Sequence, residues 1–228
     1  MALVLAPFVV LSPSGVWHLA QYHLDRPLQI ESTGAAYLLT LHVLADIPLR
    51  VVYGFGSQGL GGHGPDVVAL ISTVALAVIV VAIAWTLFAL LRRARFPGDA
   101  RLLVAATAAT MAALLAGGKV LSPQFVIWLL PAGFLVCGPY GWGAFAGTAG
   151  VMVLTQLYFP DRYWDLVAFQ HGPIALLALR DAALLVLVAL AWPRRSVERA
   201  RGRTLPTRAV PVPGEAAERA VAARYLTD

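Results

Sequence analysis

Charged residues are scarce in this chain of 228 residues: Asp, Glu, Lys and Arg make up 13%, whereas 59% of the residues are hydrophobic. The mean hydropathy is +0.75. Soluble domains typically contain about 25% charged and about 45–50% apolar residues. A single core behind a water-facing shell cannot enclose this much apolar surface, so most of the chain must face lipid. The composition excludes a soluble globular protein and predicts a multi-pass membrane protein.

Cysteine and metal-ligand patterns are also lacking. With Cys137 as the only cysteine, the chain cannot form an intrachain disulfide, a cysteine-based zinc site or a CxxC redox site. No two histidines have the His-x3-His or similar spacing that indicates a metal site. His42 lies on an apolar face, which predicts a hydrogen-bonded core residue, and His63 lies among glycines, which predicts an exposed loop residue. We therefore expect neither a metal nor a cofactor.

Lysine occurs once, and the arginines are unevenly placed. Residues 194–228 contain eight Arg and four acidic residues, which gives +4 of the total net charge of +5. Nucleic-acid binding requires basic residues interleaved with exposed aromatic ones, and this segment has only Tyr225, so we expect no nucleic-acid partner. A basic segment beside a membrane span usually lies in the cytoplasm. We therefore predict that 194–228 is a mostly disordered cytoplasmic tail.

Apolar runs from residue 67 on predict five membrane segments, because a helix needs about 20 mostly apolar residues to cross the hydrocarbon core. The runs lie at 67–91, at 102 to about 121, at 124–137 (short, with Pro131), at 142–159 and at 173–192. Arginine clusters follow the first run (Arg92, Arg93, Arg95 and Arg101) and the last one (Arg194 and Arg195). An alternating path places both clusters on one side, which the arginines identify as cytoplasmic.

The first 66 residues contain no apolar run of full length. Residues 1–11 and 34–45 each reach about half the length of a span, so each is a tilted span, a re-entrant hairpin or an interfacial helix. The stretch 17–31 is amphipathic, Pro27 should disturb any helix there, and its Trp and Tyr residues suit the headgroup region. We therefore expect 12–46 to be an interfacial or re-entrant region.

The predicted fold is all-α: a polytopic transmembrane bundle of about five to seven membrane segments over residues 1–193, with clear spans from residue 67. Residues 47–66 and 160–172 are predicted to be extracytoplasmic loops. Gly143 and Gly147, followed by Gly150, present small residues on one helix face, which favours close packing of helices in a membrane.

Ionisable groups inside or beside the apolar zone are candidates for function, because burying them in a membrane costs free energy. Four groups qualify: Asp25, Arg26, Gln29, Glu31 and Ser32; Lys119, Ser122, Pro123 and Gln124; 161–165 with His171; and the neighbours Arg180 and Asp181. Structural roles remain open for several: Lys119 can snorkel to the interface, and 161–165 can be a solvated loop. Arg180 and Asp181 point about 100° apart on a helix, so each should need a partner on another helix.

The predicted topology places Lys119, Gln124, Asp161 and His171 on the extracytoplasmic side. Cations near the bilayer surface suit a lipid phosphate, and a nearby carboxylate can accept a proton from a sugar hydroxyl. Together these groups predict a site for a lipid-phosphate-linked substrate.

Two segments resemble the C-terminal half of glycosyltransferase family 87, which consists of integral-membrane transferases of the GT-C type. They are residues 22–32 (YHLDRPLQIES) and 119–131 (KVLSPQFVIWLLP), and residues 53–57 (YGFGS) are similar to a further family loop. The resemblance covers about residues 5–192. It implies a GT-C-like fold and transfer of a sugar, typically mannose, from a polyprenyl-phosphate carrier on the extracytoplasmic side of the plasma membrane.

The resemblance also implies roles for particular residues. Arg26 and Lys119 would bind the carrier phosphate, and further residues would contact the phosphate or the sugar: Gln29, Glu31, Ser122 and Gln124. Many family members carry a His pair where this chain has Pro123 and Gln124, so the acceptor is not implied.

The catalytic acidic residue of GT-C enzymes lies in a loop far upstream that has no counterpart here, so the resemblance assigns no catalytic residue. We expect a missing N-terminal half or a partner subunit to supply this acidic residue. If the chain acted alone, it would need Asp25 or Glu31 as the base. Two alternatives to a hexosyltransferase remain open. One is a non-catalytic bundle that binds a polyprenyl lipid or a partner membrane protein. The other, less favoured because no internal repeat is present, is a small transporter.

Overall fold

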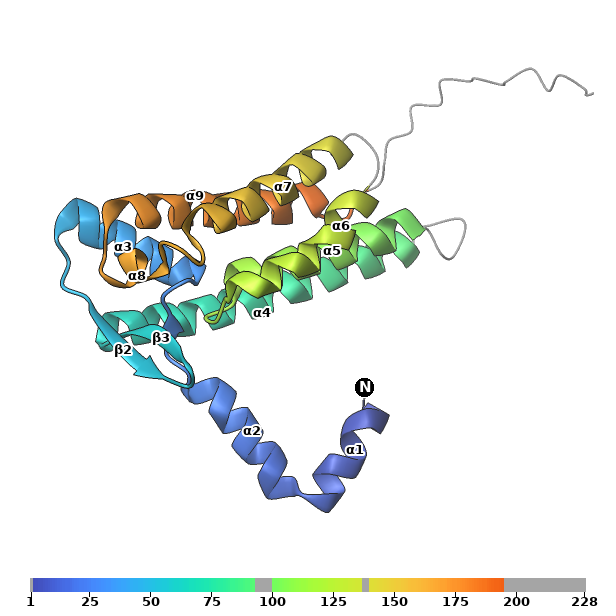
Figure 1. Cartoon of the computed structure of the whole chain (residues 1–228). Helices are drawn as coiled ribbons and strands as arrows, with labels where there is room; N and C mark the ends of the chain where they lie inside the picture. The colour runs from blue at the N-terminus through green and yellow to red at the C-terminus, as the bar shows by residue number, and fades with distance from the viewer. Residues whose placement is uncertain (1, 93–99, 137–139, 195–228) are drawn as a thin grey trace, which may run out of the picture. The chain divides into compact units, whose positions relative to one another are not determined.

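The computed structural model describes residues 2–92, 100–136 and 140–194, and most of them are helical (Figure 1). In chain order the elements are α1 (Ala2–Leu11), α2 (Pro13–Asp25), β1 (Leu28–Gln29), α3 (Thr33–Ala45), β2 (Arg50–Gly54), β3 (Ser57–Gly61), α4 (His63–Arg92), α5 (Ala100–Gly117), the 3₁₀ helix η1 (Pro123–Trp128), α6 (Leu129–Leu135), α7 (Gly141–Tyr158), α8 (Tyr163–Val167) and α9 (His171–Ala191). Several predictions concern residues outside the described part: Arg93, Arg95, Cys137, Arg195 and almost all of the tail.

Three helices, α4, α5 and α9, are long and apolar enough to cross a membrane. They confirm the runs predicted at 67–91, 102–121 and 173–192. The helices α3 and η1–α6 are shorter, and α7 is less apolar because glycines and polar side chains interrupt its sequence. Within the described residues, length and composition therefore support three spans, and the predicted five to seven membrane segments are not confirmed.

Five threonine hydroxyls inside these helices are satisfied locally. Each donates a hydrogen bond of 2.7–2.8 Å to the backbone carbonyl oxygen four residues earlier, so no polar partner is needed from outside the helix. The threonines concerned are Thr40, Thr73, Thr86, Thr110 and Thr155. This explains how helices that carry hydroxyl groups remain compatible with an apolar surrounding.

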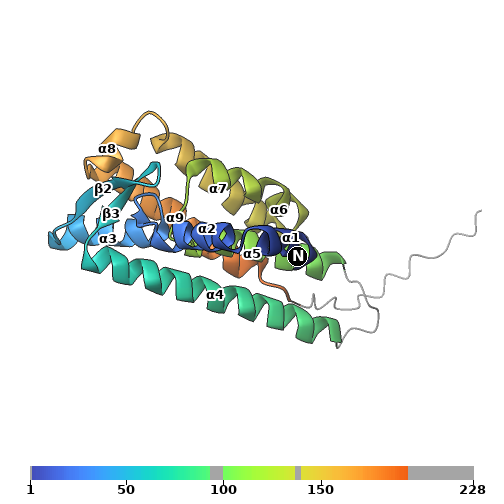
Figure 2. The ribbon, with the colours of Figure 1, turned by 90° about the horizontal axis from the view of Figure 1, so that it is seen from below.

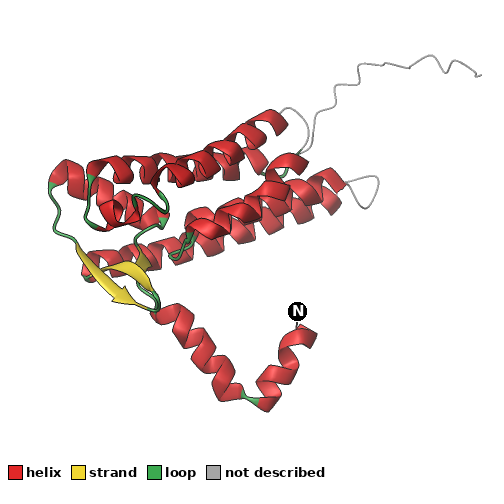
Figure 3. Ribbon diagram, in the orientation of Figure 1, coloured by secondary structure: helices red, strands yellow, loops and turns green. Residues whose placement is uncertain are grey.

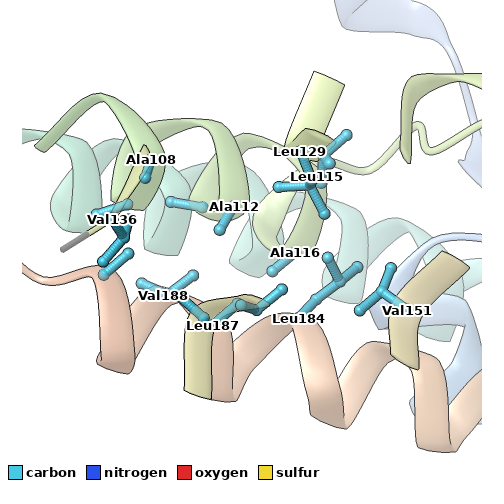
Figure 4. Close-up of a cluster of buried hydrophobic side chains, with 14 of the residues drawn as sticks. Ala108, Ala112, Leu115, Ala116, Leu129, Val136, Val151, Leu184, Leu187 and Val188 are labelled. Carbon is cyan, nitrogen blue, oxygen red and sulfur yellow. The ribbon is translucent and has the colours of Figure 1, made fainter. Parts of the chain in front are cut away.

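Small residues determine how the bundle packs. Alanines of α5, such as Ala112 and Ala116, meet Leu184 and Leu187 of α9 in the core that Figure 4 shows. On α7, a Cβ atom at Gly147 would lie 2.9 Å from a methyl carbon of Leu187, so this glycine brings α7 close to α9. The predicted packing role of the Gly143–Gly147 pattern is confirmed, because Gly143 likewise faces α9.

A three-stranded antiparallel sheet in the order β1-β3-β2 makes the fold mostly helical rather than all-α (Figure 3). The predicted loop at 47–66 contains the β2–β3 hairpin, in which Gly54 pairs with Ser57. Its two turn residues, Phe55 and Gly56, have φ values of 54° and 71°, as a two-residue type I′ turn requires. β1 pairs with β3 and so ties the segment after α2 to the hairpin.

The helices α1 and α2 form an arm whose apolar side chains are largely exposed. The hydroxyl of Ser12 accepts a hydrogen bond of 3.3 Å from Gly15 N–H and caps α2, which Pro13 begins. No residue of α2 is buried, and Leu11 and Trp17 are 83% and 59% exposed. Pro27 follows α2 instead of interrupting it, because the helix ends at Asp25.

The spans alternate in direction, so α4 and α9 end at the end of the bundle where α5 begins (Figures 1 and 2). Arg92, Arg101 and Arg194 accompany these helix termini. The opposite end holds the sheet, α8 and the candidate residues. The relative placement predicted from these arginines is confirmed, whereas their cytoplasmic location stays a prediction.

Candidate functional site

The two segments that carried most of the family resemblance lie side by side. Gln29 N–H donates a hydrogen bond of 2.9 Å to the carbonyl oxygen of Lys119. The Gln29 side-chain amide donates a second one, of 3.3 Å, to the hydroxyl of Ser122, 93 residues away. Ile30 N–H donates to the carbonyl oxygen of Gln58 in β3 (3.1 Å), which fixes the same segment to the sheet. The structure therefore joins three of the predicted site residues, Gln29, Lys119 and Ser122.

Glu31 is enclosed at the centre of this junction, with 2% of its surface exposed. Its carboxylate oxygens accept hydrogen bonds from the Gln29 amide (3.2 Å) and the Tyr158 hydroxyl (3.3 Å). Burial raises the pKa of Glu31 to about 7, although the positive charge of Arg180 and both hydrogen bonds oppose the rise. In this arrangement Glu31 and Gln29 hold segments together, and neither is open to a substrate.

Arg180 connects Glu31 to two further helices. Its guanidinium donates to Asp181 Oδ1 through Nε (2.8 Å), to the Tyr158 hydroxyl through Nη1 (2.6 Å) and to the backbone carbonyl oxygen of Glu31 through Nη2. The expectation that Arg180 and Asp181 need separate partners is thus wrong for Asp181, which pairs with its own neighbour. It is right for Arg180, which reaches α7 and the segment before α3.

These bonds form one buried polar network. Arg180 donates to Tyr158, which donates to Glu31, and Gln29 links Glu31 to Ser122. Such chains rigidify a low-dielectric interior when every member is satisfied, and an unsatisfied member is costly. Within the described residues, Gln29 Oε1 and Asp181 Oδ2 are buried without a hydrogen-bond partner. The network joins the segments before α3 and after α5 to α7 and α9.

Two predicted phosphate-binding cations, Arg26 and Lys119, lie at the edge of the network. Lys119 Nζ donates to the carbonyl oxygen of Leu24 in the last turn of α2 (2.6 Å). Arg26 donates to the Ser57 hydroxyl (3.3 Å) and lies 5.9 Å from the ring centre of Tyr22. Burial lowers the pKa of Lys119, the charge of Asp25 opposes this shift, and the charge of Arg26 adds to it. The two cations are therefore electrostatic neighbours.

The remaining predicted residues are more open. Asp25 and Gln124 are exposed, at the end of α2 and in η1 respectively, and Ser122 is half-buried. The structure brings the predicted segments together, but it divides their side chains into an enclosed pair, Gln29 and Glu31, and a surface set.

The predicted loop at 160–172 contains the short helix α8, whose first residue, Tyr163, lies close enough to Glu31 to feel its charge. Burial, and then the negative charge of Glu31, raise the pKa of Tyr163 to about 12. Arg162 and Asp165 form an exposed ion pair (3.6 Å), which agrees with a solvated surface.

The two histidines singled out in the sequence take structural positions. His42 Nδ1 lies 2.6 Å from the carbonyl oxygen of Ile47, which confirms the hydrogen bond, but His42 is half-buried and so the predicted core position is wrong. His63 is exposed as predicted, but it begins α4 instead of lying in a loop. Among the described residues, no group of three or more His, Cys, Asp or Glu side chains is placed to hold a metal.

An apolar groove of about 660 Å³ lies on one face of α5. It runs between α5 and the η1–α6 segment, and its lining includes Leu103, Met111, Leu114 and Trp128. Leu114 is the lining residue nearest the end of α5, where Gly118 N–H donates to its carbonyl oxygen (3.1 Å), and Lys119 follows five positions later along the chain. From Leu103 to Leu114 the groove follows about 16 Å of helix, roughly half the thickness of a hydrocarbon core.

Sequence reasoning missed Tyr158, which contacts both Arg180 and Glu31. The residue ends an apolar run, and nothing in the spacing shows that it meets a carboxylate 127 positions earlier. Comparison with protein families, curated proteins and solved structures gave no match for this chain. The likeness to glycosyltransferase family 87 accordingly stays a prediction that rests on the segments quoted above.

Proposed function

We propose that this chain is the carrier-binding part of a plasma-membrane glycosyltransferase that transfers a sugar, such as mannose, from a polyprenyl phosphate to an extracytoplasmic acceptor. One observation carries the proposal: the segments 25–32 and 119–124 are joined by hydrogen bonds and carry two cations, and the second segment directly follows α5, the helix that lines one side of an apolar groove. A phosphate with a long hydrocarbon chain matches this combination of charge and shape.

In the proposed complex, Arg26 and Lys119 bind the carrier phosphate. Their present partners, a serine hydroxyl and a backbone carbonyl oxygen, are neutral. Charge-assisted bonds to phosphate are roughly twice as strong as neutral ones, so phosphate oxygens can replace these partners. The hydrocarbon chain follows the groove along α5, and exposed Gln124 lies on the side where the sugar would be held.

The cations would also serve the chemistry. When the acceptor hydroxyl attacks the anomeric carbon and loses its proton to a base, the bond from that carbon to the carrier phosphate breaks. The phosphate leaves with additional negative charge, which preorganised cations stabilise. Enclosed Glu31 holds the binding segment in place, and the proposal leaves the base unassigned.

The enclosure of Glu31 favours one further candidate function: a non-catalytic bundle that binds a polyprenyl lipid. It shares the cation pair and the groove but requires no base. Transfer of a labelled sugar separates the two functions, because only the transferase passes the label from polyprenyl-phosphate mannose to an acceptor.

Binding of a polyprenyl phosphate to the purified full chain tests the shared core of both functions. We expect Arg26→Gln and Lys119→Gln each to weaken binding about tenfold or more, because each removes a charged hydrogen bond of about 1.5–3 kcal/mol. Arg50→Gln, which removes an exposed arginine from β2, is the matched control and should bind normally. Equal binding by all three variants would contradict the assignment of the phosphate site.

A further inference from the structure

A second apolar groove, of about 520 Å³, lies on another face of α5, between α4 and α9. Both of these helices pack on α5, which forms the floor. Small and apolar residues line it: Ala75 and Ile79 from α4, Ala113 and Ala116 from α5, Ala189 from α9 and Trp192 directly after α9. Its floor and both walls thus come from the three helices that qualify as membrane spans.

The first turn of α3 closes one end of this groove. Thr33 and Gly34 line it there, next to Glu31 and Ser32. A Cβ atom at Gly34 would lie 2.8 Å from a methyl carbon of Val68, so the glycine allows α3 to press against α4. A molecule bound in the groove therefore extends away from α3, towards Trp192, the lining residue that directly follows α9.

The length and the apolar lining of the groove suit a hydrocarbon chain. From Ile71 to Ile79 it follows about 12 Å of α4. A groove whose walls face the hydrocarbon core is also surrounded by lipid chains.

Arg194 supplies a positive charge at the Trp192 end. Its Nη2 donates a hydrogen bond of 2.7 Å to the carbonyl oxygen of Ala189, a lining residue, and its guanidinium lies 4.6 Å from the ring centre of Tyr140. Arg194 is exposed, so this charge is accessible. A guanidinium beside a membrane groove is suited to a phosphate headgroup.

From the groove and Arg194 together we infer that this face binds an anionic phospholipid, with one acyl chain between α4 and α9 and the phosphate at Arg194. The site is separate from the Arg26–Lys119 pair and does not depend on the proposed transfer function.

Native mass spectrometry of the detergent-purified full chain tests this site. The protein is mixed with equal amounts of phosphatidylglycerol and phosphatidylcholine that carry the same acyl chains. We expect about fivefold greater retention of phosphatidylglycerol, since one arginine near a membrane surface contributes about 1 kcal/mol. Arg194→Gln should retain the two lipids about equally.

Steric variants test the groove itself. Ala75→Phe places a ring in the groove and should abolish the retained lipid, whereas Ala77→Phe, an exposed alanine of the same helix outside the groove, should not. If Ala75→Phe does not fold, Ala189→Phe on the opposite wall and its control Val186→Phe replace the pair. Equal retention of both lipids by the unmodified chain, or equal retention by a groove variant and its control, would overturn the inference.

Discussion

Glu31→Gln tests whether the buried network carries a carboxylate whose protonation controls stability. Burial raises the pKa of Glu31 from 4.5 to about 7, so the folded state binds its proton more tightly than the unfolded state does. This contribution to stability is fully present below pH 4.5 and is lost as the pH rises through about 7. The shift corresponds to about 3 kcal/mol, at 1.36 kcal/mol per pKa unit.

The glutamine variant keeps the shape of the protonated side chain. Its carbonyl oxygen can accept from the Tyr158 hydroxyl as Glu31 Oε1 does. Its NH2 group can donate to Gln29 Oε1 if the Gln29 amide turns over, since that oxygen now has no partner among the described residues. We therefore expect the variant to match the unmodified chain at pH 5 and to exceed its stability at pH 8.

Thermal unfolding in detergent between pH 5 and pH 8 measures this difference. For a chain of this length, 1 kcal/mol corresponds to about 2–4 °C, so Glu31→Gln should have a Tm roughly 6–12 °C higher at pH 8. Asp161→Asn, which changes an exposed carboxylate at the same end, should follow the unmodified chain at every pH. A glutamine variant that is less stable at pH 8, or that keeps the original pH dependence, would refute the reasoning.

Two further predictions concern packing and orientation. Gly147→Ala should lower the free energy of unfolding by about 1–3 kcal/mol, because the new methyl would lie 2.9 Å from Leu187. The control Gly150→Ala should leave the free energy of unfolding unchanged, because a Cβ atom there would meet no neighbouring side chain within 4 Å. Equal chemical denaturation curves for the two variants would contradict this prediction. In a background without the native cysteine, a membrane-impermeant maleimide added to intact cells should label Trp164→Cys in α8. It should not label Trp142→Cys at the opposite end, and the reverse pattern would invert the proposed topology.

The helices could be predicted wherever their signal is local. The run at 67–91 matches α4 closely because no charge interrupts it. The run at 102–121 was extended too far: α5 ends at Gly117, where Gly117 and Gly118 terminate the helix. The β2–β3 hairpin was missed because five-residue strands among glycines provide too short an alternation to recognise.

The candidate site could be predicted only in part. The sequence indicated the segments around Glu31 and Lys119 because ionisable groups are unusual beside apolar runs. Which side chains are enclosed depends on tertiary contacts, and the partner of Glu31 on α7, Tyr158, is an ordinary aromatic residue at a helix end. The pairing of Arg180 with Asp181 could not be predicted either, since a helical projection does not reveal that the side chains of two neighbouring residues can meet.

The buried network also has a consequence for the order of assembly during synthesis. Glu31 is made 149 residues before Arg180, which binds its backbone, and 127 residues before Tyr158. Until α7 and α9 arrive, a carboxylate without these partners is costly to bury, so the segment before α3 must wait in a hydrated position. Arg180 pairs with its neighbour Asp181 in the folded chain, and the arrival of α9 brings the segment around Glu31, made earlier, into its enclosed position.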